Sequence, residues 1–336
     1  MKKFAKILII ILLVLAVIYG ILIAISPAQL KLDESENINA PSTMIYNVVN
    51  NLKGWEDWSP WAEMDPTAKN SYSDKTSGVG AIWNWDGEKL GKGSQKIIET
   101  VIGEKIKTDL EFEGAGTPNY STWTFNQTGE QTKVTWDFEG ADTPLFFRPF
   151  NLFMKGSLKK TYKQGLKSLK EMVEKRAKEK IYRGFKVREV DMPEKSYIMN
   201  RSVVNMENIQ QFYTQSLGAL FGKVQGANIE MDGTPSGLFF KWDEVAGTAD
   251  MATGIPIKDA INVKGASSLT IPEGKALQVD YYGDYSKTAE AHYALDDYMK
   301  DYNLINNTPV VEEYVTSEEK DPSKWLTKIT YYLSCN

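Results

Sequence analysis

The chain of 336 residues contains a single histidine, His292, and a single cysteine, Cys335. One histidine argues against a Ser-His-Asp triad and rules out a metal site built from several histidines. One cysteine rules out an intramolecular disulfide and any cysteine-cluster zinc or iron–sulfur site. His292 precedes Leu295 by three residues on a predicted helix, and we interpret it as a packed or boundary histidine. The available chemistry is therefore that of carboxylates and aromatic rings, and no cofactor is implied.

Two adjacent carboxylates, Glu312 and Glu313, lie in a short predicted strand over residues 310–315. Side chains alternate between the faces of a strand, so Glu312 shares a face with Tyr314 and Glu313 points to the other side. Two interpretations of Glu312 stay open at this point: a pocket carboxylate, or a surface carboxylate on an edge strand. Lys328 is a further unknown, because an ion pair between it and Glu312 would cancel any preference for cations.

The elements that carry these carboxylates belong to a pattern that occurs twice beyond residue 180. Each unit is predicted as strand, helix, strand, strand, and each helix has apolar residues at helical spacing. The first unit has strands around 186–190, 196–201, 238–242 and 250–257, and a helix carrying Ile209, Tyr213, Leu217 and Leu220. The second has strands around 276–282, 310–315 and 326–333, and a helix carrying Leu295, Met299 and Tyr302. Two such units predict a pseudo-twofold α+β sandwich, with the helices on one sheet face and a concave groove on the other.

Residues 183–333 resemble the GyrI-like small-molecule-binding family, the effector-binding domain of AraC-type and multidrug-responsive regulators. The matching residues are Ala249–Ile257, Tyr281-Tyr282-Gly283-Asp284-Tyr285, Pro309–Tyr314 and Thr327-Lys328-Ile329. The resemblance implies that the acidic residue of a Glu-x-Tyr element, here Glu312 with Tyr314, lies in an aromatic groove and meets a cationic amphipathic ligand. A carboxylate in apolar surroundings is costly unless a cation neutralises it, and aromatic faces attract cations as well. The other ligand-binding residues expected in this half are Tyr282, Trp325 and Tyr331.

Other functions stay open for this half. Some GyrI-like proteins resemble hydrolases of strained electrophilic compounds; in that case Glu312 would activate water, and Tyr282 or Tyr331 would orient or protonate the substrate. A scaffold whose cavities are filled cores is a third interpretation. A transcription factor is not expected, because no helix-turn-helix precedes this half. Nucleic acid is not an expected partner either, because the net charge is −5 and nucleic-acid binding favours a basic surface.

The first half of the chain is predicted as a sheet closed by a long helix. After a short polar tether, Pro41-Ser42-Thr43 precedes a helix with apolar residues from Ile45 to Leu52. Apolar residues then alternate over 106–112, 123–125 and 134–138, with a turn at 128–130, as expected for antiparallel strands. Residues 152–176 switch to helical spacing, and this amphipathic helix is the element within reach that would cover the apolar face of the sheet.

About residues 35–176 resemble the polyketide cyclase/dehydrase branch of the START-like (SRPBCC) superfamily. The residues that carry the resemblance are Trp58-Ser59-Pro60-Trp61, Ser77–Trp85, Gly91-Lys92-Gly93 and the closing helix. The resemblance implies a helix-grip fold around an apolar cavity that takes many ligands. Trp83, Trp123 and Trp136, with Trp58, Trp61 and Trp85, would line that cavity. The alternative, which we favour, is that these rings fill the core, since buried aromatic rings more often pack than bind.

The N-terminus is predicted to be a membrane anchor. Residues 7–25 carry no charge, and a 19-residue helix reaches roughly 28 Å, close to the thickness of a hydrocarbon core. A signal peptide is the alternative, but its apolar region is usually shorter, and Pro27 follows the candidate cleavage site. Lys2, Lys3 and Lys6 precede the span, so the positive-inside rule places the N-terminus in the cytoplasm and the rest on the periplasmic or outer face.

The predicted closing helix is basic in an otherwise acidic chain. Residues 155–180 hold nine lysines and Arg176 against three glutamates. One interpretation is a face that leans on anionic lipid; we favour a solvated helix face, because basic surface helices are common.

The sequence therefore predicts an α+β protein in four parts: a cytoplasmic stub and transmembrane anchor (1–28), a START-like domain (29–176), a linker (177–185) and a GyrI-like domain (186–336). The leading hypothesis is a membrane-anchored binding protein for small amphipathic or lipid-like molecules, with two ligand cavities in tandem; whether it is an enzyme stays open, and binding without catalysis is favoured. No feature of the sequence sets an oligomeric state.

Overall fold

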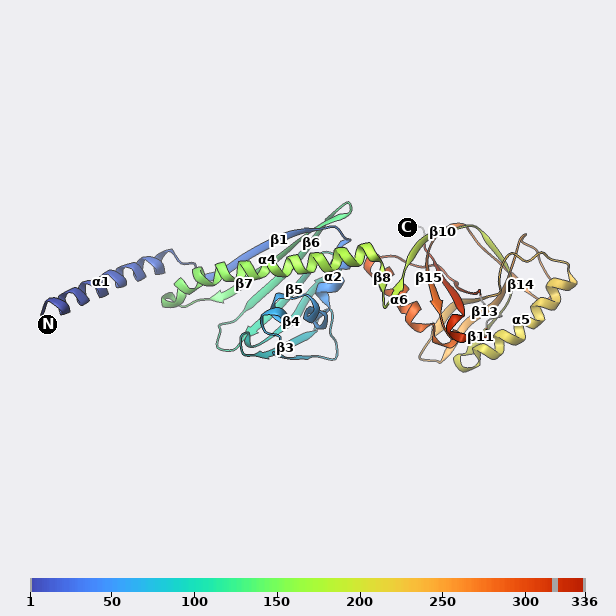
Figure 1. Cartoon of the computed structure of the whole chain (residues 1–336), viewed down its shortest axis with the longest axis horizontal. Helices are drawn as coiled ribbons and strands as arrows, with labels where there is room; N and C mark the ends of the chain where they lie inside the picture. The colour runs from blue at the N-terminus through green and yellow to red at the C-terminus, as the bar shows by residue number, and fades with distance from the viewer. Residues whose placement is uncertain (1, 316–319, 335–336) are drawn as a thin grey trace. The chain divides into compact units, whose positions relative to one another are not determined.

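A computed structural model describes residues 2–315 and 320–334 (Figure 1); Cys335 lies outside the described residues. The chain divides into two compact units, Met1–Lys178 and Glu179–Asn336. Each unit is described separately.

The first unit begins with the apolar helix α1 (Lys2–Ile25). Its residues from Lys3 to Ile25 are long and apolar enough to cross a membrane, and none of that stretch is buried in the protein. The helix ends where Ser26 donates its backbone N–H to Leu22 and Pro27 follows. The span predicted over residues 7–25 lies inside this helix.

A seven-stranded antiparallel sheet follows, in the order β1-β7-β6-β5-β4-β3-β2. Its strands are β1 (Gln29–Ile38), β2 (Lys69–Tyr72), β3 (Ile82–Gly87), β4 (Gly91–Val101), β5 (Lys105–Phe112), β6 (Asn119–Thr128) and β7 (Gln131–Asp142). The helices are α2 (Ser42–Asn50), α3 (Pro60–Met64) and α4 (Arg148–Glu179), and short 3-10 turns cover Leu52–Asp57 (η1) and Leu145–Phe147 (η2). The strands and long helix predicted for this half are confirmed.

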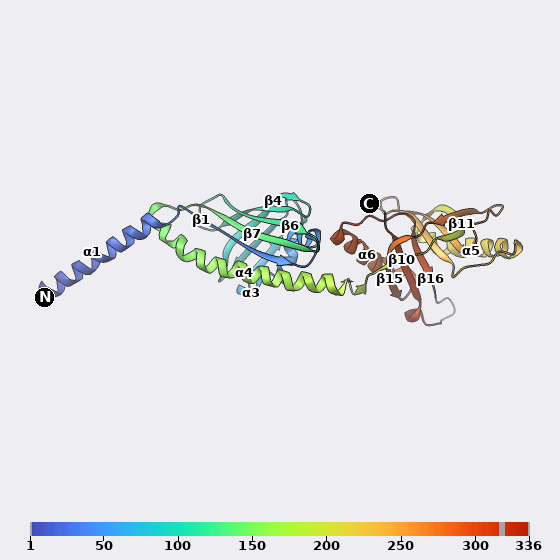
Figure 2. The same ribbon diagram turned by 90° about the horizontal axis from the view of Figure 1, so that it is seen from above.

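The long helix α4 runs lengthwise along the sheet (Figure 2). It buries Tyr162, Leu166, Leu169 and Val173, four of the residues whose spacing predicted the helix. Gly165 lies at the closest approach, because a Cβ there would be 2.8 Å from Pro60 Cδ and 3.0 Å from Trp136 Cζ3. The unit is therefore the expected helix-grip arrangement.

Strand β1 corrects one expectation, since a short polar tether was predicted before Pro41 and the structure forms a strand over Gln29–Ile38 there. This strand pairs with β7 along its length. Its acidic residues hid the strand pattern, because Glu34 occupies an inward position that is usually apolar. Glu34 is only 9% exposed and is flanked by Lys159 at 2.9 Å and Lys163 at 3.7 Å.

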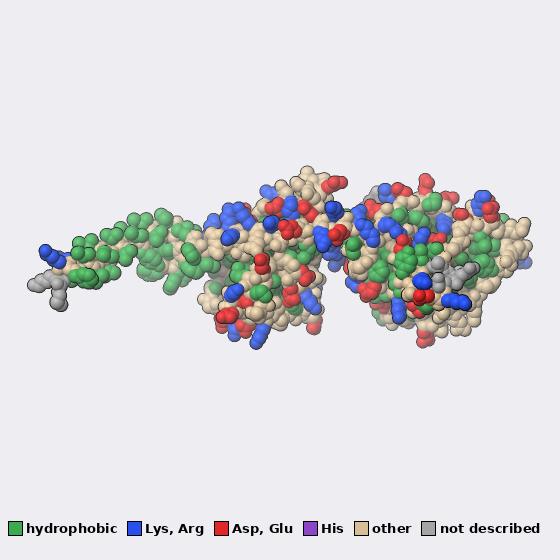
Figure 3. Space-filling model, viewed as in Figure 1, with side chains coloured by type: hydrophobic (Ala, Val, Ile, Leu, Met, Phe, Trp, Pro, Cys, Tyr) green, Lys and Arg blue, Asp and Glu red, His purple; other side chains and the backbone are tan. Residues whose placement is uncertain are grey.

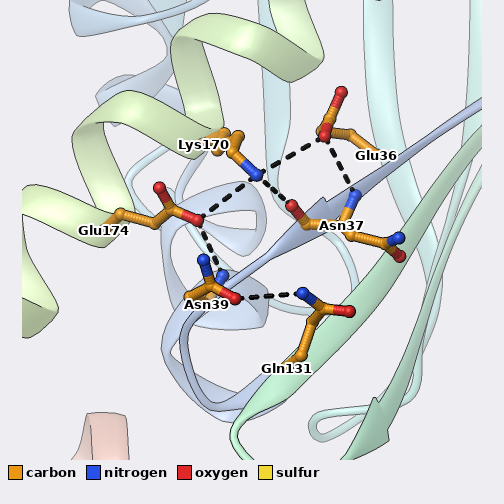
Figure 4. A network of polar contacts seen from close by, with 6 residues as sticks. All are labelled: Glu36, Asn37, Asn39, Gln131, Lys170 and Glu174. Atoms are coloured by element: carbon orange, nitrogen blue, oxygen red, sulfur yellow. Dashed lines mark hydrogen bonds and ion pairs between the residues drawn. The ribbon is translucent and has the colours of Figure 1, made fainter.

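The basic face of α4 therefore meets the acidic strand β1, and Figure 4 shows a second example of this pairing. Lys170 forms ion pairs with Glu36 at 3.5 Å and with Glu174 at 3.4 Å, and it donates to the backbone carbonyl of Asn37. Glu174 in turn accepts the backbone N–H of Asn39 at 2.8 Å. Several lysines of α4 therefore form ion pairs with β1 inside the unit. The interpretation of α4 as a helix with a solvated basic face did not anticipate these ion pairs.

The second unit is an eight-stranded sheet in the order β10-β15-β17-β16-β12-β13-β11-β14. Its strands are β10 (Arg188–Met192), β11 (Lys195–Asn205), β12 (Ser236–Asp243), β13 (Thr248–Ile257), β14 (Ser267–Ile271), β15 (Gly274–Tyr282), β16 (Val310–Tyr314) and β17 (Leu326–Tyr332). A short hairpin, β8 (Ile181–Tyr182) and β9 (Phe185–Lys186), precedes them. The helices are α5 (Ile209–Gly226) and α6 (Ala289–Tyr302), with 3-10 turns at Met206–Asn208 (η3), Tyr285–Lys287 (η4) and Pro322–Lys324 (η5).

The predicted twofold repeat is confirmed. β11, α5, β12 and β13 form one half, and β15, α6, β16 and β17 form the other, so that β12 and β16 meet in the middle of the sheet. Leu220 of α5 packs on β11 and β13, while Leu295 of α6 packs on β15 and β17. Tyr213 of α5 belongs to the same apolar cluster as Leu295, so both helices cover one face of the sheet.

Candidate functional site

Glu312 lies at the centre of the second sheet, on the face covered by the two helices. Its strand β16 is bordered by β17 and β12, and Glu312 is opposite Ile329 and Gly237 in the register. Only 4% of the residue is exposed. The interpretation as an edge-strand surface carboxylate is therefore wrong.

Three side chains form one hydrogen-bonded group with Glu312. Nε2 of His292 lies 2.7 Å from Oε1 of Glu312, and the hydroxyl of Tyr314 donates to Oε2 at 2.9 Å. Nδ1 of His292 lies 3.1 Å from the hydroxyl of Tyr331. The hydroxyl of Tyr331 also hydrogen-bonds to Asp296, and the donor and acceptor roles of the two imidazole nitrogens depend on the tautomer. Glu312 is therefore a buried carboxylate held by two side chains, His292 and Tyr314.

Sequence reasoning missed His292 as a site residue. It projects from the second turn of α6, and its side chain is 13% exposed. The face of the sheet that carries Glu312 was also predicted wrongly. Glu312 was expected in a groove on the face opposite the helices, but it lies on the face that the helices cover. That opposite face instead has its own buried cluster, which includes Leu238, Val311 and Tyr332.

Aromatic rings form the rim of the site. The ring of Tyr213 on α5 lies 5.1 Å from that of Tyr314, and the ring of Tyr285 lies 5.0 Å from that of Tyr314. Trp325 stacks on Tyr285 at 4.7 Å. The structure thus brings together four of the residues expected to bind ligand, Glu312, Tyr314, Trp325 and Tyr331, and it adds Tyr213, Tyr285 and His292.

Tyr282 does not belong to this group. Its neighbour Tyr281 packs in the cluster under the helices, so Tyr282 points to the other face of β15. Tyr282 is also 62% exposed. The expectation that Tyr282 lies in the site is therefore corrected.

The hydroxyls of the site remain protonated at neutral pH. Burial and the negative charge of Glu312 hold the pKa of Tyr314 well above its ordinary value, and burial raises the pKa of Tyr213 and Tyr285. Burial and the charge of Asp296 raise the pKa of Tyr331. Burial also raises the pKa of Asp296 itself, although the nearby His292 opposes that shift. These tyrosines therefore act as hydrogen-bond donors and not as anions.

Lys328 does not neutralise Glu312. In the register Lys328 is opposite Glu313, and paired residues share a face, so Lys328 lies on the side of the sheet away from Glu312. Glu313 has partners of its own, since Lys195 lies 3.7 Å from it and Thr234 donates to it at 3.2 Å.

Two buried threonine hydroxyls on the same face of the sheet as Glu312 have no hydrogen-bond partner among the described residues. Thr253 is opposite Gly237, and Thr327 is opposite Tyr314. Both threonines are 0% exposed, and their Oγ1 atoms have no hydrogen-bond partner among the described residues. Position 237, opposite Thr253, has no room for a side chain, because a Cβ on Gly237 would be 2.8 Å from the hydroxyl of Tyr314.

The first unit holds its tryptophans in one cluster. Trp123 stacks on Trp136 at 4.3 Å, and Trp136 stacks on Tyr162 of α4 at 3.8 Å. Trp83 is linked to these rings through Trp55, a residue that the sequence analysis did not single out. Trp55 contacts four other tryptophans: Trp58, Trp83, Trp123 and Trp136. Trp83, Trp123 and Trp136 are each at most 5% exposed, so their rings mainly meet one another.

Three buried nitrogen donors in this unit have no acceptor among the described residues: Nε1 of Trp58, Nε1 of Trp123 and Nε2 of Gln95. By contrast, Nε1 of Trp136 donates to Oγ of Ser121 at 2.8 Å. Buried polar groups are usually paired, so these donors are candidate contacts for a ligand oxygen.

Each half of the chain matches the protein family that it was expected to resemble. Residues 29–174 match the family model described as "Polyketide cyclase / dehydrase and lipid transport", and residues 185–331 match the "GyrI-like small molecule binding domain". None of the curated proteins matches the sequence.

Several solved structures are similar to parts of the chain. The EcmrR C-terminal domain is 16% identical with a TM-score of 0.41, over 45% of this chain and 99% of that one. The protein CV1439 from Chromobacterium violaceum is 19% identical with a TM-score of 0.32, over 43% and 97%. The Aha1 dimer from Colwellia psychrerythraea is 16% identical with a TM-score of 0.33, over 43% and 96%. The two halves of the chain are therefore similar, in this order, to the polyketide cyclase/dehydrase and lipid-transport family and to the GyrI-like small-molecule-binding family.

Proposed function

We propose that this chain is a membrane-anchored binding protein for small amphipathic molecules, and that Glu312 makes the GyrI-like domain select cationic ones. The observation that carries the proposal is the state of Glu312. It is 4% exposed, and its ion-pair partner among the described residues is His292 alone. A buried carboxylate without a permanent cation is costly, so a ligand cation placed beside it gains more than it would in water.

The aromatic rim supports the same class of ligand. Tyr285 stacks on Trp325 and contacts Tyr314 with a tilted ring, and all three side chains are half-buried. Aromatic faces attract cations and also accept apolar chains. In the bound complex the cation replaces His292 as the partner of Glu312, the rim covers the apolar part of the ligand, and Thr253 and Thr327 offer further polar contacts.

The anchor and the first unit complete the proposal. Helix α1 would span the membrane with its lysine-bearing end in the cytoplasm, which places both folded units on the periplasmic or outer face. The tryptophan cluster of the first unit would take an apolar or lipid-like molecule with an oxygen acceptor. The free indole N–H groups of Trp58 and Trp123 support this choice.

A second candidate function is hydrolysis of small electrophiles. It is favoured by the chain of contacts from Glu312 through His292 to Tyr331, since a histidine between an acid and a hydroxyl can pass protons during general acid–base catalysis. An enzyme would convert its ligand, whereas a binding protein releases the ligand unchanged. Mass spectrometry of the recovered ligand separates the two.

The proposal is tested with the full chain in maltoside micelles and two dyes of related shape, cationic rhodamine 6G and anionic fluorescein. Fluorescence anisotropy is expected to show saturable binding of the cation, at least about tenfold tighter than that of the anion, because one hydrogen-bonded charge contributes about 1.5–3 kcal/mol. Equal affinities would overturn selection by charge. Absence of saturable binding by either dye would favour the scaffold.

A further inference from the structure

Six large apolar side chains stand exposed around the start of α4. They form what we call the phenylalanine patch: Leu145 (51% exposed), Phe146 (68%), Phe147 (68%), Phe150 (60%), Leu152 (41%) and Phe153 (77%). Soluble proteins seldom expose so many large apolar neighbours, and such a patch usually marks an interface with an apolar partner. The packing of the sheet does not use these side chains, since α4 first contributes a run of buried apolar residues from Tyr162 onward.

The patch is held beside the end of α1. Asn151 is buried and donates from Nδ2 to the carbonyl of Pro27 at 3.0 Å, and the N–H of Thr143 donates to the carbonyl of Ala28 at 2.8 Å. Nearer the N-terminal end of α1, the hydroxyl of Tyr19 donates to the carbonyl of Phe146. In Figure 3 the hydrophobic surface of α1 continues onto the adjoining surface of the first unit.

These contacts set the depth of the patch relative to α1. Tyr19 precedes Ile25, the last residue of α1, by six positions, so the contact with Phe146 lies about 9 Å back along the helix axis at 1.5 Å per residue. Amphipathic helices that lie in a membrane surface bury their apolar face to a depth of about 5–10 Å. If α1 crosses a bilayer, the patch therefore lies at the depth of the outer acyl chains.

The charges around the patch fit the same partner. Between Thr143 and Met154 the only charged residue is Arg148, and α4 then carries Lys155 and Lys160 on exposed positions. An apolar segment followed by lysines is the pattern of a helix end that enters a bilayer while its basic residues stay among the headgroups.

We propose that the phenylalanine patch inserts into the same bilayer leaflet that α1 leaves, as a second membrane contact of the first unit. The inference rests on the proposed membrane anchoring by α1. Two contacts with one bilayer fix the orientation of the first unit, which a single helix followed by Ser26 and Pro27 would leave free to rotate.

The test places an environment-sensitive label at three positions of the full chain in vesicles of phosphatidylcholine and phosphatidylglycerol. The native cysteine is removed by Cys335→Ser, and an NBD label is attached in turn to Phe150→Cys, Lys160→Cys and Leu15→Cys. Quenching by phosphatidylcholine spin-labelled on its acyl chain then reports contact with lipid. Position 150 tests the patch, position 160 is a matched control farther along the same helix, and position 15 tests α1 independently.

The inference expects severalfold stronger quenching at position 150 than at position 160, with strong quenching at position 15. Quenching at 15 but not at 150 would overturn the inference and leave the anchor standing. Quenching at 150 but not at 15 would support the patch and overturn the spanning helix. Equal quenching at 150 and 160 would overturn the inference, because the lipid contact would then not be confined to the patch. No quenching at any position would also overturn it, because there would be no lipid contact.

Discussion

Nε2 of His292 lies 2.7 Å from Oε1 of Glu312, although one residue comes from α6 and the other from the central strand β16. This contact makes a histidine the internal partner of the carboxylate proposed to bind a cation. A ligand cation and the His292 imidazole would therefore compete for the same carboxylate oxygen.

Gly237 should be needed for the position of the Tyr314 hydroxyl. A Cβ at Gly237 would lie 2.8 Å from that hydroxyl and 2.9 Å from Phe239 Cε2, so Gly237→Ala must displace Tyr314 from Glu312. We expect severalfold weaker cation binding and a loss of about 1 kcal/mol in the free energy of unfolding, the usual value of one hydrogen bond. Gly274→Ala is the control, because a Cβ there meets nothing within 4 Å. Wild-type affinity in Gly237→Ala would contradict the role of Tyr314.

The aromatic rim makes a separate prediction. Tyr285→Ala removes the ring that contacts both Tyr314 and Trp325, and should weaken cation binding by about 0.5–2 kcal/mol, the range of a cation–π contact. Tyr282→Ala, on the opposite face of β15, should have no effect on binding. Equal effects of the two substitutions in calorimetric titrations would show that the rim does not contact the ligand.

The fold was largely predictable because period-two and helical spacings are local features of the sequence. The repeat that contains Ile209, Leu295 and β16 was visible in this way. Glu312 and Tyr314 were placed on one face by alternation alone. Helix contacts were not predictable: His292 reaches Glu312 only because α6 packs on β15 and β17, next to β16 in the sheet, and no spacing along the chain encodes that contact. Strand β1 was missed because Glu34 occupies an inward position, where its charge is balanced by lysines more than 120 residues away.

The tryptophan cluster predicts a difference between two similar substitutions. Trp136→Phe loses the hydrogen bond to Ser121, whereas Trp123→Phe removes an N–H that has no partner among the described residues. Urea unfolding of the first unit should therefore show Trp136→Phe to be less stable than Trp123→Phe by about 1 kcal/mol. The reverse order would show that the Trp123 N–H is paired, most simply with a retained ligand.

The most direct test of the account compares Glu312→Gln with Glu313→Gln in the full chain. The two substitutions remove the same charge from neighbouring residues of β16, but Glu313 faces away from the helices and pairs with Lys195. Titration with rhodamine 6G at pH 8 should show about tenfold to hundredfold weaker binding for Glu312→Gln, from the loss of a charged hydrogen bond or ion pair, and near wild-type binding for Glu313→Gln. Equal affinity of Glu312→Gln and the wild type would contradict the claim that Glu312 selects the ligand.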